Sequence, residues 1–379
     1  MPRRLLSLSA GCGAGHNRAA EAIDAAAREF FPDVSSAWVD SLKFTNRLFR
    51  AVYGDSYVWM VNHSPTLWGI LYDMMGKKVQ APAMERAIKT FDKLAYRKLK
   101  QHVDEFRPDA VVCTHFLPTN VVLARFKHKP PPVFVVVTDF DVHSAWINRE
   151  ATAYFVSSDE IRHRVAGFGY PADRIHVTGI PILPVFSRRR GRDAVLKDLG
   201  LAPKAPVVLM ISGGVGMSNL EEAVERVLAV PEDMHLLVVC GRNEKMKKRL
   251  ETVTRGMGDR ARIFGFVTNV HDMMEAADVA ITKSGGLTVS EALTRGTPMI
   301  IYMPIPGQEE RNADYLLEQG AAVKAQGIET IDYKVRELLK APERLVRMRQ
   351  AAEAIARPNA ARDVVRLAIE LSSGRMGGA

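Results

Sequence analysis

Residues 284–322 read SGGLTVSEALTRGTPMIIYMPIPGQEERNADYLLEQGAA, and this stretch decides the fold. Its pattern predicts a glycine loop, a helix, a short buried strand, a second loop and a second helix. Apolar residues recur at helical spacing after Gly286, and Gly296-Thr297-Pro298 ends that helix. The apolar run Met299–Met303 is typical of a strand that is covered on both faces, as in a parallel sheet.

Two predicted helices therefore begin beside the carboxyl ends of parallel strands. Glycines before such helices let the phosphates of a ligand approach backbone N–H groups, and the helix dipoles favour negative charge there. Glu291 is placed to bind both hydroxyls of a ribose, and Gln308 and Glu309 to bind the hydroxyls of a sugar. A Gly-Gly turn alone often only closes a strand–helix unit, so the complete string carries the prediction of a nucleotide-sugar site.

The complete string resembles the nucleotide-sugar signature of GT-B glycosyltransferases. Within them it is similar to monogalactosyldiacylglycerol synthases and processive diacylglycerol glucosyltransferases, and more distantly to the lipid II N-acetylglucosaminyltransferase. The segment Pro306–Asn312, PGQEERN, is closer to the glycolipid synthases. The resemblance implies an α/β fold with two Rossmann-like parallel-sheet domains that face each other across a cleft. It also implies a C-terminal helix that returns to the first domain, and a UDP-sugar site made of Gly15, Gly213, Gly214, Gly216, Arg242, Phe266, Val267, Ser284, Gly285, Gly286, Leu287, Thr288, Glu291, Gln308, Glu309 and Asn312.

A second glycine loop, Gly11–His16, follows the first predicted strand. Gly-x-Gly-x-Gly in this position suggests a dinucleotide site, but His16 stands where such a loop needs Gly or Ala. The string GxGxGHxxAA resembles the N-terminal loop of the same glycolipid synthases. A histidine with a pKa near ~6.5 can take a proton from an attacking hydroxyl at neutral pH. His16 is therefore predicted to be the catalytic base; alternatively, it only orders the turn.

The string Thr138–Trp146, TDFDVHSAW, also follows a buried strand and resembles the family's TDF-x-x-H-x-x-W motif beside the acceptor site. Asp139 is predicted to orient His16 or to act as the base itself. His143 and Trp146 are predicted to contact the acceptor, although a structural role for His143 is equally consistent with the sequence. His115, after the preceding strand, is a weaker candidate.

Residues 44–80 combine aromatic side chains, Trp59 and Trp68 among them, with lysines and arginines. This composition suits a membrane interface, and an aromatic core is the alternative. The net charge is +9, and most of the excess lies in residues 1–190, which indicates an anionic partner. A membrane surface fits better than nucleic acid, and a solubilising surface is the ordinary alternative. The basic run Arg188–Arg192 could meet lipid phosphates or be a solvated linker.

The three cysteines show no metal spacing and are expected to be buried residues of a reduced protein. No apolar run approaches the ~20 residues of a transmembrane helix, and the N-terminal run is too short for a signal peptide. The expected location is cytoplasmic, on the inner face of the cell membrane.

The domains are predicted at 1–184 for the acceptor and membrane, 185–357 for the UDP-sugar, and 358–371 for the returning helix, with a tail at 372–379. The predicted activity is inverting transfer of glucose or galactose from a UDP-sugar to a diacylglycerol-type lipid. No metal or cofactor is expected, because helix N-termini at 213–216 and 285–288 can stabilise the diphosphate and no Asp-x-Asp pair is placed to hold a metal. The alternatives are a UDP-N-acetylhexosamine transferase that acts on a polyprenyl lipid, a sugar-nucleotide 2-epimerase, and a basic binding protein.

Overall fold

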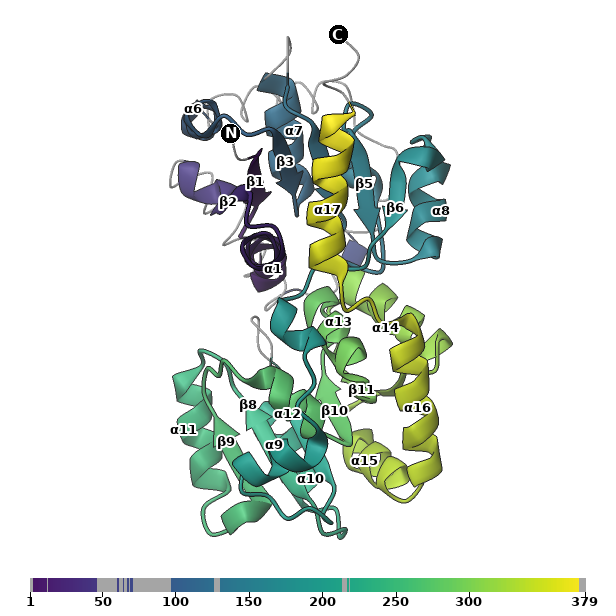
Figure 1. The fold of residues 1–379 in the computed structure, drawn as a ribbon. Coiled ribbons are helices and arrows are strands. Elements are labelled where there is room, and N and C mark those ends of the chain that lie inside the picture. The colour runs from purple at the N-terminus through teal and green to yellow at the C-terminus, as the bar shows by residue number, and fades with distance from the viewer. Residues whose placement is uncertain are drawn as a thin grey trace. The chain divides into compact units, whose positions relative to one another are not determined.

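The protein is described by a computed structural model that covers residues 3–11, 13–45, 60, 64, 67, 69–70, 97–125, 130–212, 217 and 219–374. The predicted site residues Trp59, Trp68, Gly213, Gly214 and Gly216 lie outside the described residues, as does most of the aromatic–basic segment 44–80. The chain divides into two compact units, and each contains one six-stranded parallel sheet (Figure 1). The predicted fold class, two parallel-sheet α/β domains, is therefore confirmed.

Unit 1 comprises residues 1–184, 306–308 and 358–379. Its sheet has the order β2-β1-β3-β4-β5-β6. The strands are β1 (Arg3–Ser9), β2 (Val34–Asp40), β3 (Ala110–Cys113), β4 (Val133–Val136), β5 (Ala153–Val156) and β6 (Ile175–Val177). The helices are α1 (Ala14–Phe30), α6 (Arg97–Phe106), α7 (Phe116–Arg125), α8 (Asp159–Gly167) and α17 (Ala360–Ser373).

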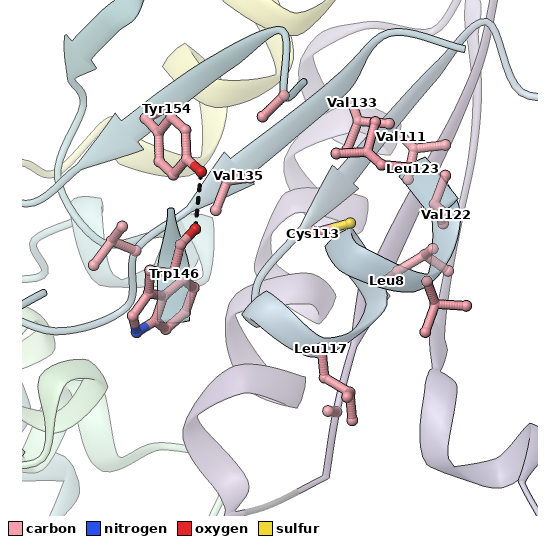
Figure 2. Packing of buried hydrophobic residues seen from close by; sticks show 14 of the residues in the cluster. Leu8, Val111, Cys113, Leu117, Val122, Leu123, Val133, Val135, Trp146 and Tyr154 are labelled. Atoms are coloured by element: carbon pink, nitrogen blue, oxygen red, sulfur yellow. Dashed lines mark hydrogen bonds between the residues drawn. The ribbon is translucent and has the colours of Figure 1, made fainter. Parts of the chain in front are cut away.

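Both faces of the first sheet are covered by helices. Successive side chains of each strand point to opposite faces, so neighbouring residues of β1 join different clusters. Leu8 packs with Leu117 and Val122 of α7 on one face (Figure 2). Leu6 belongs to the same cluster. Leu5 packs on the other face with the helices α1 and α17. The C-terminal helix thus belongs to the core of unit 1, although its residues are far from β1 in the sequence.

Unit 2 comprises residues 185–305 and 309–357. Its sheet has the order β12-β11-β10-β7-β8-β9. The strands are β7 (Val207–Ile211), β8 (His235–Val239), β9 (Ala261–Phe264), β10 (Val279–Thr282), β11 (Met299–Tyr302) and β12 (Ala322–Ala325). The helices are α9 (Arg192–Asp198), α10 (Leu220–Leu228), α11 (Glu244–Val253), α12 (Val270–Ala276), α13 (Gly286–Arg295), α14 (Gln308–Glu318), α15 (Ile331–Leu339) and α16 (Pro342–Ile355).

Each sheet has a point where the strand order reverses. In unit 1 it lies between β1 and β3, and in unit 2 between β7 and β10. Ligands of open parallel sheets bind outside the carboxyl ends of the strands at such points. The glycine loop after β1 and the loop Lys283–Gly285 after β10 both occupy this position. The topology therefore selects two of the predicted loops as candidate sites.

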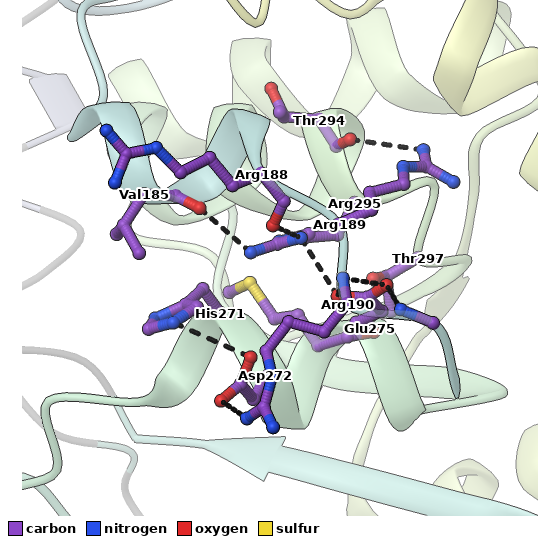
Figure 3. A network of polar contacts seen from close by, with 12 residues as sticks. Val185, Arg188, Arg189, Arg190, His271, Asp272, Glu275, Thr294, Arg295 and Thr297 are labelled. Atoms are coloured by element: carbon purple, nitrogen blue, oxygen red, sulfur yellow. Dashed lines mark hydrogen bonds and ion pairs between the residues drawn. The ribbon is translucent and has the colours of Figure 1, made fainter. Parts of the chain in front are cut away.

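The basic run Arg188–Arg192 is bound within unit 2 (Figure 3). Arg190 pairs with Asp198 and Asp272, and Arg192 pairs with Asp278. The guanidinium groups of Arg189, Arg190 and Arg192 are thus paired with carboxylates of the same unit.

A buried ion pair lies under this run. The side chain of Arg295 has no solvent exposure, and its Nη1 lies 3.0 Å from Oε2 of Glu275. Arg295 also donates to the carbonyl oxygens of Arg188 and Val185, at 2.6 and 3.0 Å. Glu275 in turn accepts from the backbone N–H groups of Arg190 and Gly191. The pair therefore fixes the first residues of unit 2 to helices α12 and α13.

Cys113 and Cys240 are buried and free, as expected for a reduced protein, and Cys12 lies outside the described residues. Within the described part of the chain, no helix is both long enough and apolar enough to cross a membrane.

Candidate functional site

The loop after β1 places His16 in the first turn of α1. Gly11 is needed there, because an added Cβ would lie 2.6 Å from Oδ2 of Asp40. Asp40 instead accepts from the backbone N–H of Gly11 at 3.1 Å and caps the turn after β2. Gly13 precedes the helix with φ 120°, a left-handed conformation that favours glycine. Gly15 lies next to His16 in the same turn.

The ring of His16 is held through Nδ1. This nitrogen lies 2.9 Å from the carbonyl oxygen of Thr114, which follows β3, and 2.9 Å from Oγ1 of Thr138, which follows β4. A carbonyl oxygen can only accept a hydrogen bond, so Nδ1 carries the proton and Nε2 carries the lone pair. Burial lowers the pKa of His16 to about 4, against a smaller opposite effect of the Thr114 carbonyl. His16 is therefore a neutral imidazole at neutral pH with the lone pair on Nε2, and its pKa lies below the value of about 6.5 expected from the sequence.

His16 belongs to a cluster of rings in unit 1. The ring centroid of His115 lies 4.6 Å from that of His16, in an edge-to-face arrangement, and Trp146 lies 6.2 Å away. Phe116 stacks on His115 at 4.2 Å and contacts His143 and Trp146 at 5.5 and 5.6 Å. The structure thus brings Trp146 close to His16, and His143 joins the same cluster through Phe116 and Trp146.

Burial keeps these histidines uncharged. It lowers the pKa of His143 to about 4, although the carboxylate of Asp141 raises it. It also lowers the pKa of His115 well below its usual value, and His16 and His143 contribute to that shift. The cluster is therefore an uncharged and largely buried group of rings at neutral pH.

The loop that carries Asp139 and His143 is fixed by three neighbours. Arg164 of α8 pairs with the buried carboxylate of Asp141 and donates to the carbonyl of Val142 at 3.2 Å. Ser157 donates to the backbone carbonyl of Asp139 at 2.8 Å. The hydroxyl of Tyr154 donates to the carbonyl of Trp146 at 2.8 Å (Figure 2). These contacts pre-organise the loop beside His16, and they leave Asp141 as a structural partner of an arginine.

In unit 2, the predicted phosphate loop joins β10 to α13. Gly285 is the N-cap of α13, and Gly286, Leu287 and Thr288 form its first turn. Ser284 is buried and its hydroxyl donates to the carbonyl of Glu309 at 2.6 Å. Asn312 has no exposed surface and its amide donates to the carbonyl of Ser284 at 2.9 Å. Ser284 and Asn312 therefore join the loop before α13 to the first turns of α14, the two parts of the predicted UDP-sugar site.

Glu309 is also part of this joint. Its Oε2 accepts from the backbone N–H of Ile305 at 2.7 Å, and its Oε1 would lie 3.4 Å from a Cβ added at Gly285. Burial raises the pKa of Glu309, while the Ile305 N–H and Lys283 lower it. One carboxylate oxygen thus supports the loop, and the other faces the phosphate loop. Glu291 on α13 and Gln308 at the start of α14 are half-buried.

Phe266 is the aromatic residue predicted for the UDP-sugar site, and 61 % of its surface is exposed. The guanidinium of Arg242 lies 5.4 Å from the centroid of its ring. Val267 follows it, half-buried, after the end of β9. An exposed ring beside a cation can stack with a flat, electron-poor base.

Three residues of these sites were not singled out from the sequence: Thr114, Thr138 and Lys283. Lys283 precedes the phosphate loop, and burial lowers its pKa while the carboxylate of Glu309 raises it. The position of Lys283, directly before a predicted phosphate loop, could have marked it as a phosphate ligand from the sequence alone. The two threonines gave no such signal, because only the sheet order brings them to His16. Among the described residues, no group of three His, Cys, Asp or Glu side chains could hold a metal ion.

Comparisons with known proteins agree with these observations. Residues 16–182 match the family profile of monogalactosyldiacylglycerol (MGDG) synthase, and residues 192–355 match glycosyl transferases group 1. The chain is 34 % identical over 275 residues to the processive diacylglycerol beta-glucosyltransferase of Bacillus thuringiensis (strain Al Hakam), and the match covers 72 % of this chain and 71 % of the relative. It is 29 % identical over 366 residues to the enzyme of the same name from Bacillus cereus (strain G9842), covering 96 % and 92 %.

Among solved structures, MurG from Acinetobacter baumannii superimposes with a TM-score of 0.64 at 19 % identity, covering 97 % of this chain and all of that one. The two parallel sheets, each with a glycine loop at its reversal point, together with this likeness, define an α/β protein of the GT-B class. Within that class, the chain belongs to the glycosyltransferase family of monogalactosyldiacylglycerol synthases and processive diacylglycerol glucosyltransferases. It is an enzyme that transfers hexosyl groups.

Proposed function

We propose that the protein transfers a hexose from a UDP-sugar to the free hydroxyl of a diacylglycerol, with inversion at the anomeric carbon. The observation that carries the proposal is the state of His16: a neutral imidazole whose Nδ1–H is bound and whose Nε2 keeps the lone pair. The names of the relatives support the choice of lipid and of a hexosyl donor.

In the proposed reaction, Nε2 of His16 takes the proton of the acceptor hydroxyl. The hydroxyl oxygen attacks the anomeric carbon from the face opposite the diphosphate. The bond between this carbon and the diphosphate oxygen breaks, and UDP leaves with the electron pair. The N-terminus of α13, with the backbone N–H groups of Gly286 and Leu287, is placed to stabilise the departing charge.

The remaining donor contacts follow from the chemistry of each side chain. Glu291 accepts from the ribose hydroxyls, and the second carboxylate oxygen of Glu309 and the amide of Gln308 bind the sugar. Phe266 and Arg242 hold the uracil by stacking. Either glucose or galactose suits these groups, because the two sugars differ in the orientation of a single hydroxyl.

The acceptor side favours a neutral lipid over a polyprenyl diphosphate. The rings of His115, His143, Phe116 and Trp146 pack around His16, and burial keeps the histidines uncharged. A diphosphate-linked acceptor needs cations near the base, because buried anions are unfavourable without a partner. The glycerol hydroxyl of diacylglycerol has no such requirement.

We further propose that the enzyme works without a metal, on the inner face of the cell membrane, where an anionic surface attracts its basic first half. Helix N-termini and Lys283 would supply the positive charge that a metal often provides.

Product analysis tests the proposal. The protein is incubated with diacylglycerol in anionic vesicles and EDTA, with UDP-glucose, UDP-galactose or UDP-N-acetylglucosamine supplied in parallel. A glycolipid from one hexose donor is expected, and a series of products would show repeated transfer. UDP binding without any glycolipid would refute the acceptor, and activity only after a divalent metal is restored would refute metal independence.

A further inference from the structure

Thr138 begins the loop after β4 and contacts His16, which follows the glycine loop after β1. Thr138 has 3 % of its surface exposed. Its Oγ1 is 2.9 Å from Nδ1 of His16, which is 122 positions away in the sequence. The same nitrogen is 2.9 Å from the carbonyl oxygen of Thr114. One ring nitrogen therefore has two oxygen neighbours at hydrogen-bond distance.

The chemistry of the three groups fixes the direction of both bonds. The Thr114 carbonyl cannot donate, so Nδ1 must carry a proton. A protonated ring nitrogen has no lone pair in the ring plane, so Thr138 cannot donate to it either. The hydroxyl oxygen of Thr138 must accept, and the single N–H is shared between two acceptors.

We propose that Thr138 is a positioning residue for the base: its Oγ1 is the second acceptor of the His16 Nδ1–H, and with the Thr114 carbonyl it fixes the tautomer whose Nε2 faces the acceptor hydroxyl. The inference rests on the proposed function of His16 as the base. A shift of the proton to Nε2 would bring the Nδ1 lone pair against the lone pairs of the carbonyl, which is unfavourable. The arrangement thus keeps Nε2 free to accept a proton.

The same two acceptors act during the reaction. When Nε2 takes the proton of the lipid hydroxyl, the ring becomes an imidazolium and its Nδ1–H becomes a stronger donor. Hydrogen bonds to a charged donor are about twice as strong as neutral ones. Both oxygens belong to neutral groups, so they orient the ring without adding a permanent negative charge beside it.

The titratable groups around His16 come from several elements. His115 contacts its ring from the turn before α7, and His143 and Asp139 lie on the loop after β4. Asp141 on the same loop is paired with Arg164 of α8, and Asp40 after β2 binds the glycine loop. A change confined to the Thr138 hydroxyl leaves all of these groups in place.

The test uses Thr138→Val, which removes the hydroxyl and keeps the shape, and Thr138→Ser, which keeps the hydroxyl. Thr178→Val is the matched control, because Thr178 is buried in unit 1 and its hydroxyl donates to the carbonyl of Gly179. We expect kcat to fall roughly ten- to a hundredfold in Thr138→Val, as for the loss of one charge-assisted hydrogen bond, with KM for the UDP-sugar unchanged. Thr138→Ser and Thr178→Val should stay within about threefold of the unchanged enzyme.

A second readout does not depend on turnover. The ¹⁵N resonances of the His16 ring, assigned with His16→Gln, should show a protonated Nδ1 and an unprotonated Nε2 at pH 7. Thr138→Val should keep the proton on Nδ1, which the Thr114 carbonyl still binds, and should shift the Nδ1 resonance because one of its two acceptors is lost. Thr138→Ser should leave this resonance unchanged. If Thr138→Val does not fold, Thr138→Ser is compared with Thr138→Ala, which differ only in the hydroxyl.

Three outcomes overturn the inference: a protonated Nε2 in the unchanged protein, unchanged kcat and ring resonances in a folded Thr138→Val, or a loss in Thr138→Ser as large as in Thr138→Val. Failure of the proposed function looks different. In that case His16→Ala would retain full turnover, or no glycolipid would form, while the ring resonances would still report on the role of Thr138.

Discussion

Replacing Glu275 with glutamine should remove the counter-charge of a guanidinium that has no access to solvent. Glu275 and Arg295 form the buried ion pair of unit 2, and both bind the backbone of residues 185–191 (Figure 3). Burial lowers the pKa of Arg295 and Glu275 raises it, but a guanidinium stays protonated in proteins. The Glu275→Gln variant therefore contains a buried, unpaired positive charge.

The size of the effect follows from the burial. The Arg295 side chain is fully buried and that of Glu275 is 7 % exposed. Removal of one partner of such a pair costs about 3–5 kcal/mol of the free energy of unfolding. Arg295→Gln should cost less, because the carboxylate of Glu275 keeps its backbone donors at Arg190 and Gly191, at 3.0 and 2.7 Å. The double variant should cost at least about 1 kcal/mol less than the sum of the two single variants, because the residues are in contact.

Urea unfolding at pH 7 measures these values with two probes. All four tryptophans, Trp38, Trp59, Trp68 and Trp146, precede residue 185 in the sequence, so their fluorescence reports on unit 1. Far-UV circular dichroism reports on helices of both units. Glu275→Gln should lower the urea midpoint for unfolding of unit 2, which circular dichroism detects and tryptophan fluorescence does not.

The exposed pair Arg189–Glu353 provides the control, because its side chains are 49 % and 42 % exposed. Glu353→Gln should change the unfolding free energy by no more than about 1 kcal/mol. A loss below about 1 kcal/mol in Glu275→Gln, or additivity of the single variants within about 0.5 kcal/mol, would refute the argument from the buried charge.

Three further predictions concern the sites. His16→Ala should abolish turnover and leave UDP affinity unchanged in calorimetry; unchanged rates would remove His16 as the base. Glu291→Ala should weaken UDP binding by about 2–3 kcal/mol, the loss expected for charge-assisted hydrogen bonds, whereas normal affinity would place the ribose elsewhere. The pKa of His16 and that of His143 are about 4 in the folded protein and about 6.5 when unfolded, so the unfolded chain binds more protons between these values. Stability should therefore fall as the pH drops from 6.5 to 4, by up to about 3 kcal/mol for each histidine, and His143→Gln should reduce this slope in urea unfolding; an equal slope would show that His143 is not buried as a neutral ring.

Much of the fold was predictable because its signals are local. Short apolar runs such as Val207–Ile211 and Met299–Tyr302 alternate with amphipathic helices, and glycine loops follow the strands. Periodicity and turn chemistry depend on neighbouring residues, so they can be read without the tertiary structure.

The sequence by itself determined the class of the protein, two parallel-sheet domains with a glycine loop in each, and the candidate role of His16. The tertiary structure decided which groups act on these residues. Thr114 and Thr138 meet His16 only because β1, β3 and β4 are neighbours in the sheet, across 98 and 122 positions of sequence. Likewise, the ion-pair partners of Arg190 are carboxylates of α9 and α12. The sequence names each charged or hydroxyl side chain but not its surroundings. Its partner and its burial set its pKa and its role, and both are decided only when distant strands pair.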